Sequence, residues 1–505
     1  MRERNMITQT REIFRKYTDD ATFEKIVETD TLNEMLERSV SEFARDIAIC
    51  DNGKEYTYEQ LGSDVGHFRP LVAGDAKRVG ILASNSYDFV KAFLAITTLG
   101  LTAVILPAHL DDMTVFGCCM KFGIGKLVYQ SELEEKTKIV AAKRPDIELI
   151  RADALSSSSV PAAKCTADTP CVIMFTGGTT GKSKGALLSH GAVMQGVVNG
   201  CYGYRDVFGQ RYLLVLPLSH VFGLIRNLLT SLYTGSALWI CRNNKDMFRD
   251  IAVFRPTILV LVPALAEMAL NLSKKFGKNM LGEDMKYIIC GAAPVSPYLI
   301  KEYEKFGITA FPGYGLTESA NLVSGNPECL KYPESVGIPY PNQELKIVDG
   351  ELWLRGKNMM LGYVGEEEDP REDGWFRTGD LVRTDENGML YIIGRIKEII
   401  ILSNGENISP AEVEAKFNEL DIIQDSQVFE DVLENGEHIL ALEVVPRATE
   451  VAKLGLDDPK PYIVGELEKI NGTLPSFQRV SRIAVRDTDF ARTPSMKIAR
   501  YKKCN

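Results

Sequence analysis

The sequence predicts an α/β protein with a large N-terminal domain, built of mixed and parallel sheets flanked by helices, and a small C-terminal α+β domain. The first observation is the regular alternation of short apolar runs with helical segments over about 340 residues. The second is a change, near residue 340, to short strands joined by Asp-Gly and Asn-Gly turns, which is typical of a small β-rich subdomain. The third is the length of 505 residues, too long for one hydrophobic core.

The first predicted elements follow a strand–helix–strand order, which favours parallel sheets covered by helices. They are a helix entry at 56–62, a strand at 78–84, a helix at 85–99, a strand at 102–107 and a buried strand at 171–176. The serine-rich stretch 156–159 is typical of an exposed connector.

The same pattern returns in four further apolar runs, each of which ends at a loop carrying Gly, Pro, His or Asn. They lie at 212–220, 236–241, 257–263 and 287–290. Ligands of open α/β sheets bind outside the carboxyl ends of the strands, so these loops are the predicted site.

The C-terminal part begins with a segment of its own. A strand and a turn after Gly394 and Arg395 lead to a helix that starts at Ser409-Pro410, because proline suits the first helical position. We predict an N-terminal domain over 1–394, with its β-rich subdomain at about 340–394, and a C-terminal domain over 395–505.

Composition excludes several classes of protein. A formal net charge of −10 argues against nucleic-acid binding. The ten cysteines show no metal-ligand or redox spacing, which predicts reduced thiols in a reducing compartment such as the cytoplasm. The polar N-terminus shows no signal core, and no apolar run approaches the ~20 residues of a membrane helix.

The clearest motif is the glycine-rich loop directly after the buried strand, Phe175 to Gly185. Glycines let backbone N–H groups approach an anion, and Thr and Lys side chains add donors and charge. The predicted phosphate-binding residues are Thr176, Gly177, Gly178, Thr179, Thr180, Gly181 and Lys184. A P-loop is excluded because its register requires glycine where Thr176 stands.

Five motifs in order identify a resemblance to the adenylate-forming (AMP-binding) superfamily, in its acyl-CoA synthetase or fatty-acid–CoA ligase branch. They are the loop FTGGTTGKSKG, then Gly291-Ala-Ala-Pro294, GYGLTE at 313–318, GWFRTGD at 374–380 with Gly394-Arg395, and TPSMKIAR at 493–500. The chain departs from the usual pattern at Gly177, Ser183 and Met496. None of these departures removes a required charge.

The resemblance implies that ATP, Mg²⁺ and coenzyme A take part, and it assigns roles to the motif residues. Thr317 would contact the α-phosphate, and Glu318 would hold Mg²⁺. Asp380 and Arg395 would bind the ribose. The residues implied around the adenine and its phosphate are Gly291, Ala292, Ala293, Tyr314 and Gly315.

Two lysines are implied to act through movement of the C-terminal domain as a lid. Lys497 would enter the site and bridge the acyl carboxylate and the ribose–phosphate region, so it is the expected catalytic lysine. Lys397 stands at the position of the family's hinge residue.

The acid is expected beside LPLSHVFG at 216–223, which matches the acyl- and aryl-acid members. His220 stands where amino-acid-activating members tend to place an aspartate, so an α-ammonium would lack a partner. The predicted acyl pocket contains His220, Val221, Gly223, Leu224 and Gly313, with His220, Thr317 and Glu318 counted as catalytic beside Lys497. Arg226 would bind a polar or anionic tail of the acid or reach solvent.

The predicted reaction is therefore ATP-dependent activation of a carboxylic acid, fatty or with another uncharged chain, followed by transfer to coenzyme A. Three alternatives stay open. They are an acyl carrier protein as acceptor, an aryl acid as substrate, and a non-catalytic acyl-nucleotide binding protein on the same fold.

Overall fold

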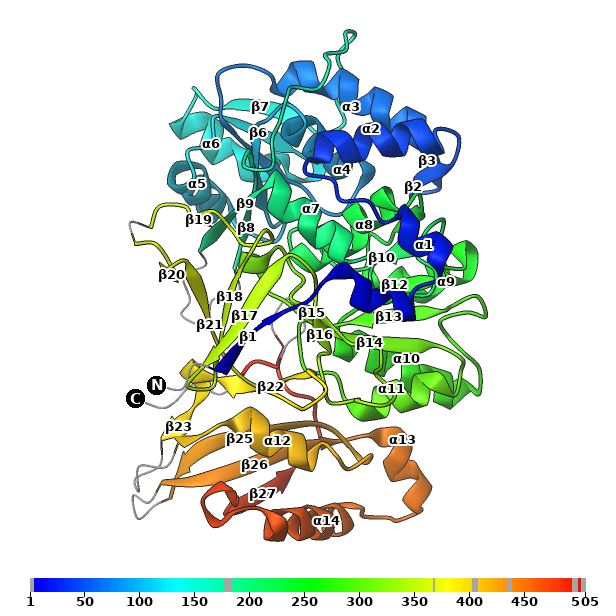
Figure 1. Ribbon diagram of the computed structural model, residues 1–505, viewed down its shortest axis with the longest axis vertical. Coiled ribbons are helices and arrows are strands. Elements are labelled where there is room, and N and C mark those ends of the chain that lie inside the picture. Colours follow the sequence, from blue (N-terminus) through cyan, green and yellow to red (C-terminus); the bar gives the residue numbers. More distant parts are fainter. Residues whose placement is uncertain are drawn as a thin grey trace.

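The computed structural model describes residues 4–176, 184–366, 368–401, 407–433, 438–492 and 498–500. It shows helix-flanked sheets, with the C-terminal elements set below the large N-terminal part (Figure 1). The α/β class with a large and a small part is thereby confirmed.

A nine-stranded sheet forms the centre of the large part, and its middle strands are parallel. Its strands, in spatial order, are β16 (Ile338–Pro339), β15 (Ser324–Gly325), β14 (Thr309–Tyr314), β13 (Tyr287–Cys290), β12 (Ile258–Leu261), β10 (Arg211–Leu214), β11 (Ala237–Ile240), β2 (Ile47–Asp51) and β3 (Lys54–Thr57). The predicted run 287–290 is β13, the runs 236–241 and 257–263 contain β11 and β12, and the run 212–220 overlaps β10.

A seven-stranded mixed sheet holds the strand that precedes the glycine-rich loop. Its order is β19 (Gly362–Tyr363), β9 (Gly185–Ser189), β8 (Pro170–Phe175), β5 (Thr102–Leu106), β4 (Arg78–Leu82), β6 (Lys126–Tyr129) and β7 (Glu148–Arg151). The strands β8 and β9 are antiparallel, so the loop between them returns the chain to the same edge of the sheet.

The helices of the large part pack on these two sheets. They are α1 (Asp20–Lys25), α2 (Leu32–Phe43), α3 (Tyr58–Val72), α4 (Tyr87–Thr97), α5 (Asp112–Lys121), α6 (Lys138–Lys143), α7 (His190–Asn199), α8 (Thr230–Tyr233), α9 (Met247–Phe254), α10 (Pro263–Phe276) and α11 (Pro297–Glu304). The helix predicted at 85–99 is α4, which is shorter because the side chain of Ser86 caps it by accepting from the Phe89 N–H. A π-helical segment, η3 (Phe222–Leu229), begins in the last residues of the predicted acid loop, which is the segment 216–223.

The β-rich segment predicted from about residue 340 is a six-stranded sheet. It contains β17 (Gln343–Val348), β18 (Glu351–Gly356), β21 (Trp375–Thr384), β20 (Arg371–Glu372) and β22 (Leu390–Arg395). Its remaining strand, β1 (Arg4–Thr8), comes from the other end of the sequence and pairs antiparallel with β17. No sequence pattern predicted β1.

The small C-terminal part has a hydrophobic core of its own, which includes Ile400, Phe417 and Leu467. Its elements are α12 (Pro410–Phe417), β25 (Ile423–Val432), β26 (His438–Pro446), α13 (Ala448–Val451), α14 (Lys460–Thr473) and β27 (Arg482–Val485). The predicted helix start at Pro410 is confirmed. The two parts meet where α13 lies beside α10 and α11 (Figure 1).

Candidate active site

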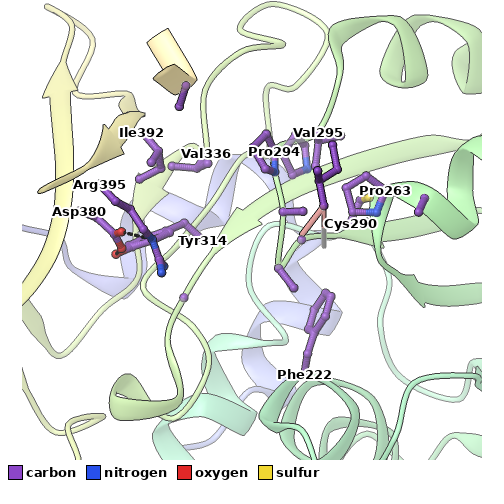
Figure 2. Close-up of a pocket in the computed structure, with 18 of the residues that line it drawn as sticks. Phe222, Pro263, Cys290, Pro294, Val295, Tyr314, Val336, Asp380, Ile392 and Arg395 are labelled. Atoms are coloured by element: carbon purple, nitrogen blue, oxygen red, sulfur yellow. Dashed lines mark hydrogen bonds and ion pairs between the residues drawn. The ribbon is translucent and has the colours of Figure 1, made fainter. Parts of the chain in front are cut away.

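A cleft of about 3640 Å³ runs between the large part and the C-terminal elements. Most of the predicted site residues that the structure describes line it. They are Thr176, Lys184, His220, Val221, Gly291, Ala292, Ala293, Gly313, Tyr314, Gly315, Thr317, Glu318, Asp380, Arg395 and Lys397. Figure 2 shows Tyr314, Asp380 and Arg395 along one side of this pocket and Phe222, Pro263 and Cys290 along the other.

One wall of the cleft carries a buried carboxylate held by two partners. Asp380 is 1% exposed. The Tyr314 hydroxyl donates to its Oδ2 at 2.5 Å, and Arg395 Nε lies 2.7 Å from its Oδ1. Burial beside this carboxylate raises the pKa of Tyr314 well above its usual value, so the phenol stays a neutral donor. The carboxylate is therefore fixed in orientation at the edge of the cleft.

The turn before Asp380 is fixed by the neighbouring strand β18. The Gly379 N–H donates to Glu351 Oε1 at 3.0 Å, and the Thr378 hydroxyl donates to the Leu352 carbonyl at 2.7 Å. Glu351 also forms an ion pair with Arg377, whose Nη2 lies 2.8 Å from Glu351 Oε2. Sequence reasoning missed Glu351 because its partners are distant in the chain.

The loops after β13 and β14 approach the cleft through their backbones. At Gly315 a Cβ would lie 1.1 Å from the Asn321 carbonyl oxygen, so only glycine fits there. Ala292 adopts a φ of 66°, in the left-handed region that alanine rarely occupies. Backbone groups of both loops therefore lie against the space that the motif predicts for a nucleotide.

A second carboxylate, Glu318, lies next to the end of the glycine-rich loop. The Tyr363 hydroxyl donates to Glu318 Oε1 at 2.6 Å. The ammonium of Lys184 lies 4.8 Å from the Tyr363 ring centroid and 3.6 Å from a Glu366 carboxylate oxygen. Tyr363 was missed by the sequence reasoning, because no motif joins β19 to residue 318.

Some predicted residues lie outside the described part of the chain. They are Gly177, Gly178, Thr179, Thr180, Gly181 and Lys497. Their described neighbours line the cleft: Thr176 and Lys184 flank the first gap, and Arg492 and Ile498 flank the second. The Thr176 N–H donates to the Lys184 carbonyl at 2.9 Å, which closes the base of the glycine-rich loop.

The side chain of Asn85, which lies just before α4, fixes the predicted acid loop through two hydrogen bonds. Asn85 donates to the Leu216 carbonyl at 2.9 Å and accepts from the Leu218 N–H at 2.8 Å. His220 Nδ1 accepts from the Phe222 N–H at 3.2 Å. Of the predicted acyl-pocket residues, Gly223 and Leu224 are buried behind this wall and do not line the cleft. At Gly223 a Cβ would lie 2.3 Å from the Pro217 carbonyl oxygen, so glycine permits the tight return of the chain.

Comparison with known proteins agrees with this geometry. The model of the AMP-binding enzyme family matches residues 36–364. The 4-coumarate–CoA ligase-like 6 of Arabidopsis thaliana is 30% identical over 414 residues, which cover 73% of this chain and 72% of the relative. The long-chain-fatty-acid–CoA ligase of Yersinia pestis is 33% identical over 264 residues, 48% of this chain and 46% of that protein.

A solved structure extends the likeness to nearly the whole chain. The anthranilate CoA ligase AuaEII in complex with anthranoyl-AMP superposes with a TM-score of 0.80 at 20% identity. The match covers 93% of this chain and 96% of that one.

Proposed function

We propose that this chain, which belongs to the AMP-binding enzyme family, activates a carboxylic acid as its acyl-AMP and transfers the acyl group to coenzyme A. The observation that carries the proposal is the convergence of Asp380, Glu318 and His220 on one cleft. The reaction requires a carboxylate that binds the ribose hydroxyls, a carboxylate that holds the metal ion at the phosphates, and an apolar pocket for the acid. Asp380, Glu318 and the wall beside His220 fill these three roles in turn.

The first step joins the substrate carboxylate to the α-phosphorus of ATP and breaks the bond to pyrophosphate. Asp380 accepts hydrogen bonds from the ribose hydroxyls, with Tyr314 and Arg395 holding it in place. Thr317 faces the α-phosphate. Thr176 and Lys184, at the ends of the glycine-rich loop, stabilise the leaving pyrophosphate. Fixed donors and charges of this kind lower the barrier because they need no reorganisation during reaction.

The Mg²⁺ ion that the family implies fits the donor set around Glu318. Mg²⁺ is usually held by one or two carboxylates together with substrate phosphates and waters. Glu318 lines the cleft and supplies one such carboxylate, which the Tyr363 hydroxyl orients. The ion would neutralise charge on the phosphates.

The acid binds beside His220, against an apolar wall. Val221, Phe222 and Phe311 line this side of the cleft. We propose an acid whose chain is apolar next to the reacting carboxyl, which includes fatty and aryl acids. The relatives named above are ligases of coumarate type and of long-chain fatty acids, and both classes fit such a wall.

The second step moves the acyl group to a thiol with release of AMP. We propose that the C-terminal part acts as a lid about Lys397 and that Lys497 serves the first step. Ile498 and Arg500, which follow the second gap in the chain, line the cleft. Coenzyme A is the proposed acceptor, and an acyl carrier protein is the alternative.

The setting of the reaction is also part of the proposal. The nine cysteines in the described ranges are free thiols, which suits a reducing compartment such as the cytoplasm. In the ranges covered by the structure, none of the helices has the length and apolarity required to span a bilayer.

Acid-dependent exchange of labelled pyrophosphate into ATP tests the proposal. We expect exchange with a subset of an acid panel and no exchange without acid. Adding coenzyme A should give the matching thioester and AMP in equal amounts. Tight nucleotide binding with no exchange for any acid would contradict the proposal and support the binding-only alternative.

A further inference from the structure

A fully buried arginine lies one helical turn beyond the acid loop. Arg226 belongs to η3 and is 0% exposed, so it does not reach solvent. None of its three guanidinium nitrogens makes a hydrogen bond of good geometry with a described residue, although the Tyr204 and Tyr212 hydroxyls are close enough to interact with it. An arginine stays protonated in proteins, so this is a buried positive charge with unsatisfied donors. Such a charge is strongly unfavourable unless an anion pairs with it.

The protein groups around Arg226 supply hydroxyls instead of a negative charge. Tyr204, Tyr212 and Tyr340 are among the side chains that act on it electrostatically, and its Cζ lies 5.1 Å from the Tyr204 ring centroid. Burial raises the pKa of Tyr212 and Tyr340, so both phenols are neutral at pH 7. Like the guanidinium, the Tyr212 hydroxyl makes no hydrogen bond of good geometry in the described ranges. The cluster therefore contains a buried positive charge on Arg226 and tyrosine hydroxyls that can donate hydrogen bonds to an anion.

This cluster stands directly behind the proposed acid pocket. Tyr204 and Tyr340 line the cleft together with Phe222 and Phe311. Phe222 and Arg226 are four residues apart in η3, so they lie close together on its surface. The Tyr204 ring contacts the ring of Phe311, with centroids 4.9 Å apart, so the cluster adjoins the apolar wall.

We propose that the acid substrate carries a second anionic oxygen group, such as a carboxylate, at the end far from the reacting carboxyl, and that Arg226, Tyr204 and Tyr340 bind it. This inference rests on the proposed function and narrows its substrate class. The tail accepts hydrogen bonds from the Tyr204 and Tyr340 hydroxyls, and Arg226, buried next to them, supplies the opposite charge. The preferred acid then has an apolar segment between two anionic ends.

Paired acids test this inference in the intact enzyme. Each pair consists of an alkyl or aryl acid and the same acid with a distal carboxylate, over a series of lengths, and pyrophosphate exchange gives kcat/KM. We expect the best distal-carboxylate acid to exceed its partner by about a hundredfold or more, since a site built for a polar group strongly rejects the analogue without it. Arg226→Met should bring the ratio of the two kcat/KM values, distal-carboxylate acid over its partner, near one. Tyr340→Phe should lower this ratio.

Two further measurements separate binding from a purely structural role. Arg69→Met is the matched control, because Arg69 is also buried but donates to Thr98 and to the Val160 carbonyl. It should keep the ratio. We expect the distal-carboxylate acid to raise the Tm of the wild type, and this shift should vanish in Arg226→Met. The unliganded Arg226→Met protein should keep or raise its Tm, because an unpaired buried charge is removed.

Two results would overturn the inference. They are equal or better wild-type turnover of the acids without a distal anion, and an unchanged ratio in Arg226→Met, whether or not the Tm of that variant falls. Absence of exchange with every acid would instead overturn the proposed function itself.

Discussion

Tyr314 and Asp380, 66 residues apart in sequence, are joined by a 2.5 Å hydrogen bond from the phenol to Oδ2 of the carboxylate. The tyrosine lies at the end of β14 and the aspartate within β21, so this contact connects the nine-stranded and six-stranded sheets. Its consequence is a carboxylate whose position is set before any nucleotide binds.

Removing the charge of Asp380 should weaken ATP binding. Asp380→Asn keeps the shape but loses hydrogen bonds to a charged group, worth about 1.5–3 kcal/mol, so KM for ATP should rise roughly tenfold to a hundredfold. Tyr314→Phe should give a smaller rise, because the carboxylate remains but is less well held. Initial rates at varied ATP measure both effects.

Asp385→Asn is the control for the variants Asp380→Asn and Tyr314→Phe. Asp385 lies in the turn between β21 and β22 and accepts from the Asn387 and Met389 N–H groups. Its loss should affect folding stability without the rise in KM for ATP. If both aspartate variants raise this KM equally, Asp380 has no special role at the nucleotide.

A buried histidine should make stability depend on pH. Burial lowers the pKa of His190 to about 4, and its Nδ1 accepts from the Leu32 N–H at 3.2 Å. The unfolded chain, with a pKa near 6.5, binds a proton more readily than the folded protein between these values. Stability is therefore full above about pH 6.5 and falls as pH drops towards 4, by about 3 kcal/mol from this group.

Denaturant unfolding across this pH range measures the effect. His190→Asn should flatten the pH dependence of the unfolding free energy. His67, which is only partly buried, is the control, and His67→Asn should leave the dependence in place. An equal slope in wild type and His190→Asn would contradict the assignment.

The contact between the large part and the C-terminal part should depend on one buried ion pair. Arg447 is 0% exposed, donates from Nε to Glu267 Oε1 at 2.7 Å and stacks on Tyr298 at 3.7 Å. Nearby, Lys274 pairs with Glu450 at 3.0 Å. Although burial opposes ionisation of Glu450, hydrogen bonds from Lys453, Tyr298 and Lys274 lower its pKa to about 2.

Arg447→Met should destabilise this contact by about 3–5 kcal/mol, because Glu267 is left buried without its partner. Limited proteolysis between residues 395 and 409 should then become faster. Glu267→Gln in the same chain should restore much of the loss, as expected for a coupled pair. Additive losses in the double variant would show that the two residues act separately.

The wall beside His220 should discriminate against amino acids. An α-ammonium buried without a carboxylate costs several kcal/mol, so an alkyl acid should exceed its α-amino analogue by roughly a hundredfold or more in kcat/KM. His220→Ala should lower activity with the alkyl acid and leave the amino acid poor, since no negative charge is added. Robust turnover of an amino acid by the wild type would contradict this.

Much of the site was readable from the sequence because its motifs are local. The GYGLTE and GWFRTGD segments, with Gly394-Arg395, placed Tyr314, Asp380 and Arg395 at one nucleotide site, and the structure brings these three together. The strands β4, β5 and β13 were predicted from their apolar runs. The elements that were missed depend on contacts distant in the chain. The strand β1 pairs with β17 more than 300 residues away, and Tyr363 contacts Glu318 from β19 of the seven-stranded sheet, 45 residues further along the chain.

Arg226 shows the limit of local reasoning most clearly. A charged residue in an apolar segment fits either an exposed position or a buried binding site, and the sequence left both open. Burial of a side chain depends on which elements pack over it. Here Tyr204 and Tyr340 come from loops distant in the chain, so no local pattern could decide.

Lys497 should separate the two half-reactions. Lys497→Ala is expected to slow acyl-adenylate formation by orders of magnitude with little change in KM for ATP, because the role proposed for this lysine is in the transition state. Thioester formation from supplied acyl-AMP should largely survive. Equal collapse of both steps would contradict the role of Lys497.

The most direct test of the reaction follows one oxygen atom. If the carboxylate attacks the α-phosphorus, an acid labelled with ¹⁸O in its carboxyl group must pass one labelled oxygen to AMP when coenzyme A takes the acyl group. Mass spectrometry of the products should therefore show a single ¹⁸O in AMP and none in pyrophosphate. Unlabelled AMP, or label in released inorganic phosphate, would contradict an acyl-adenylate route.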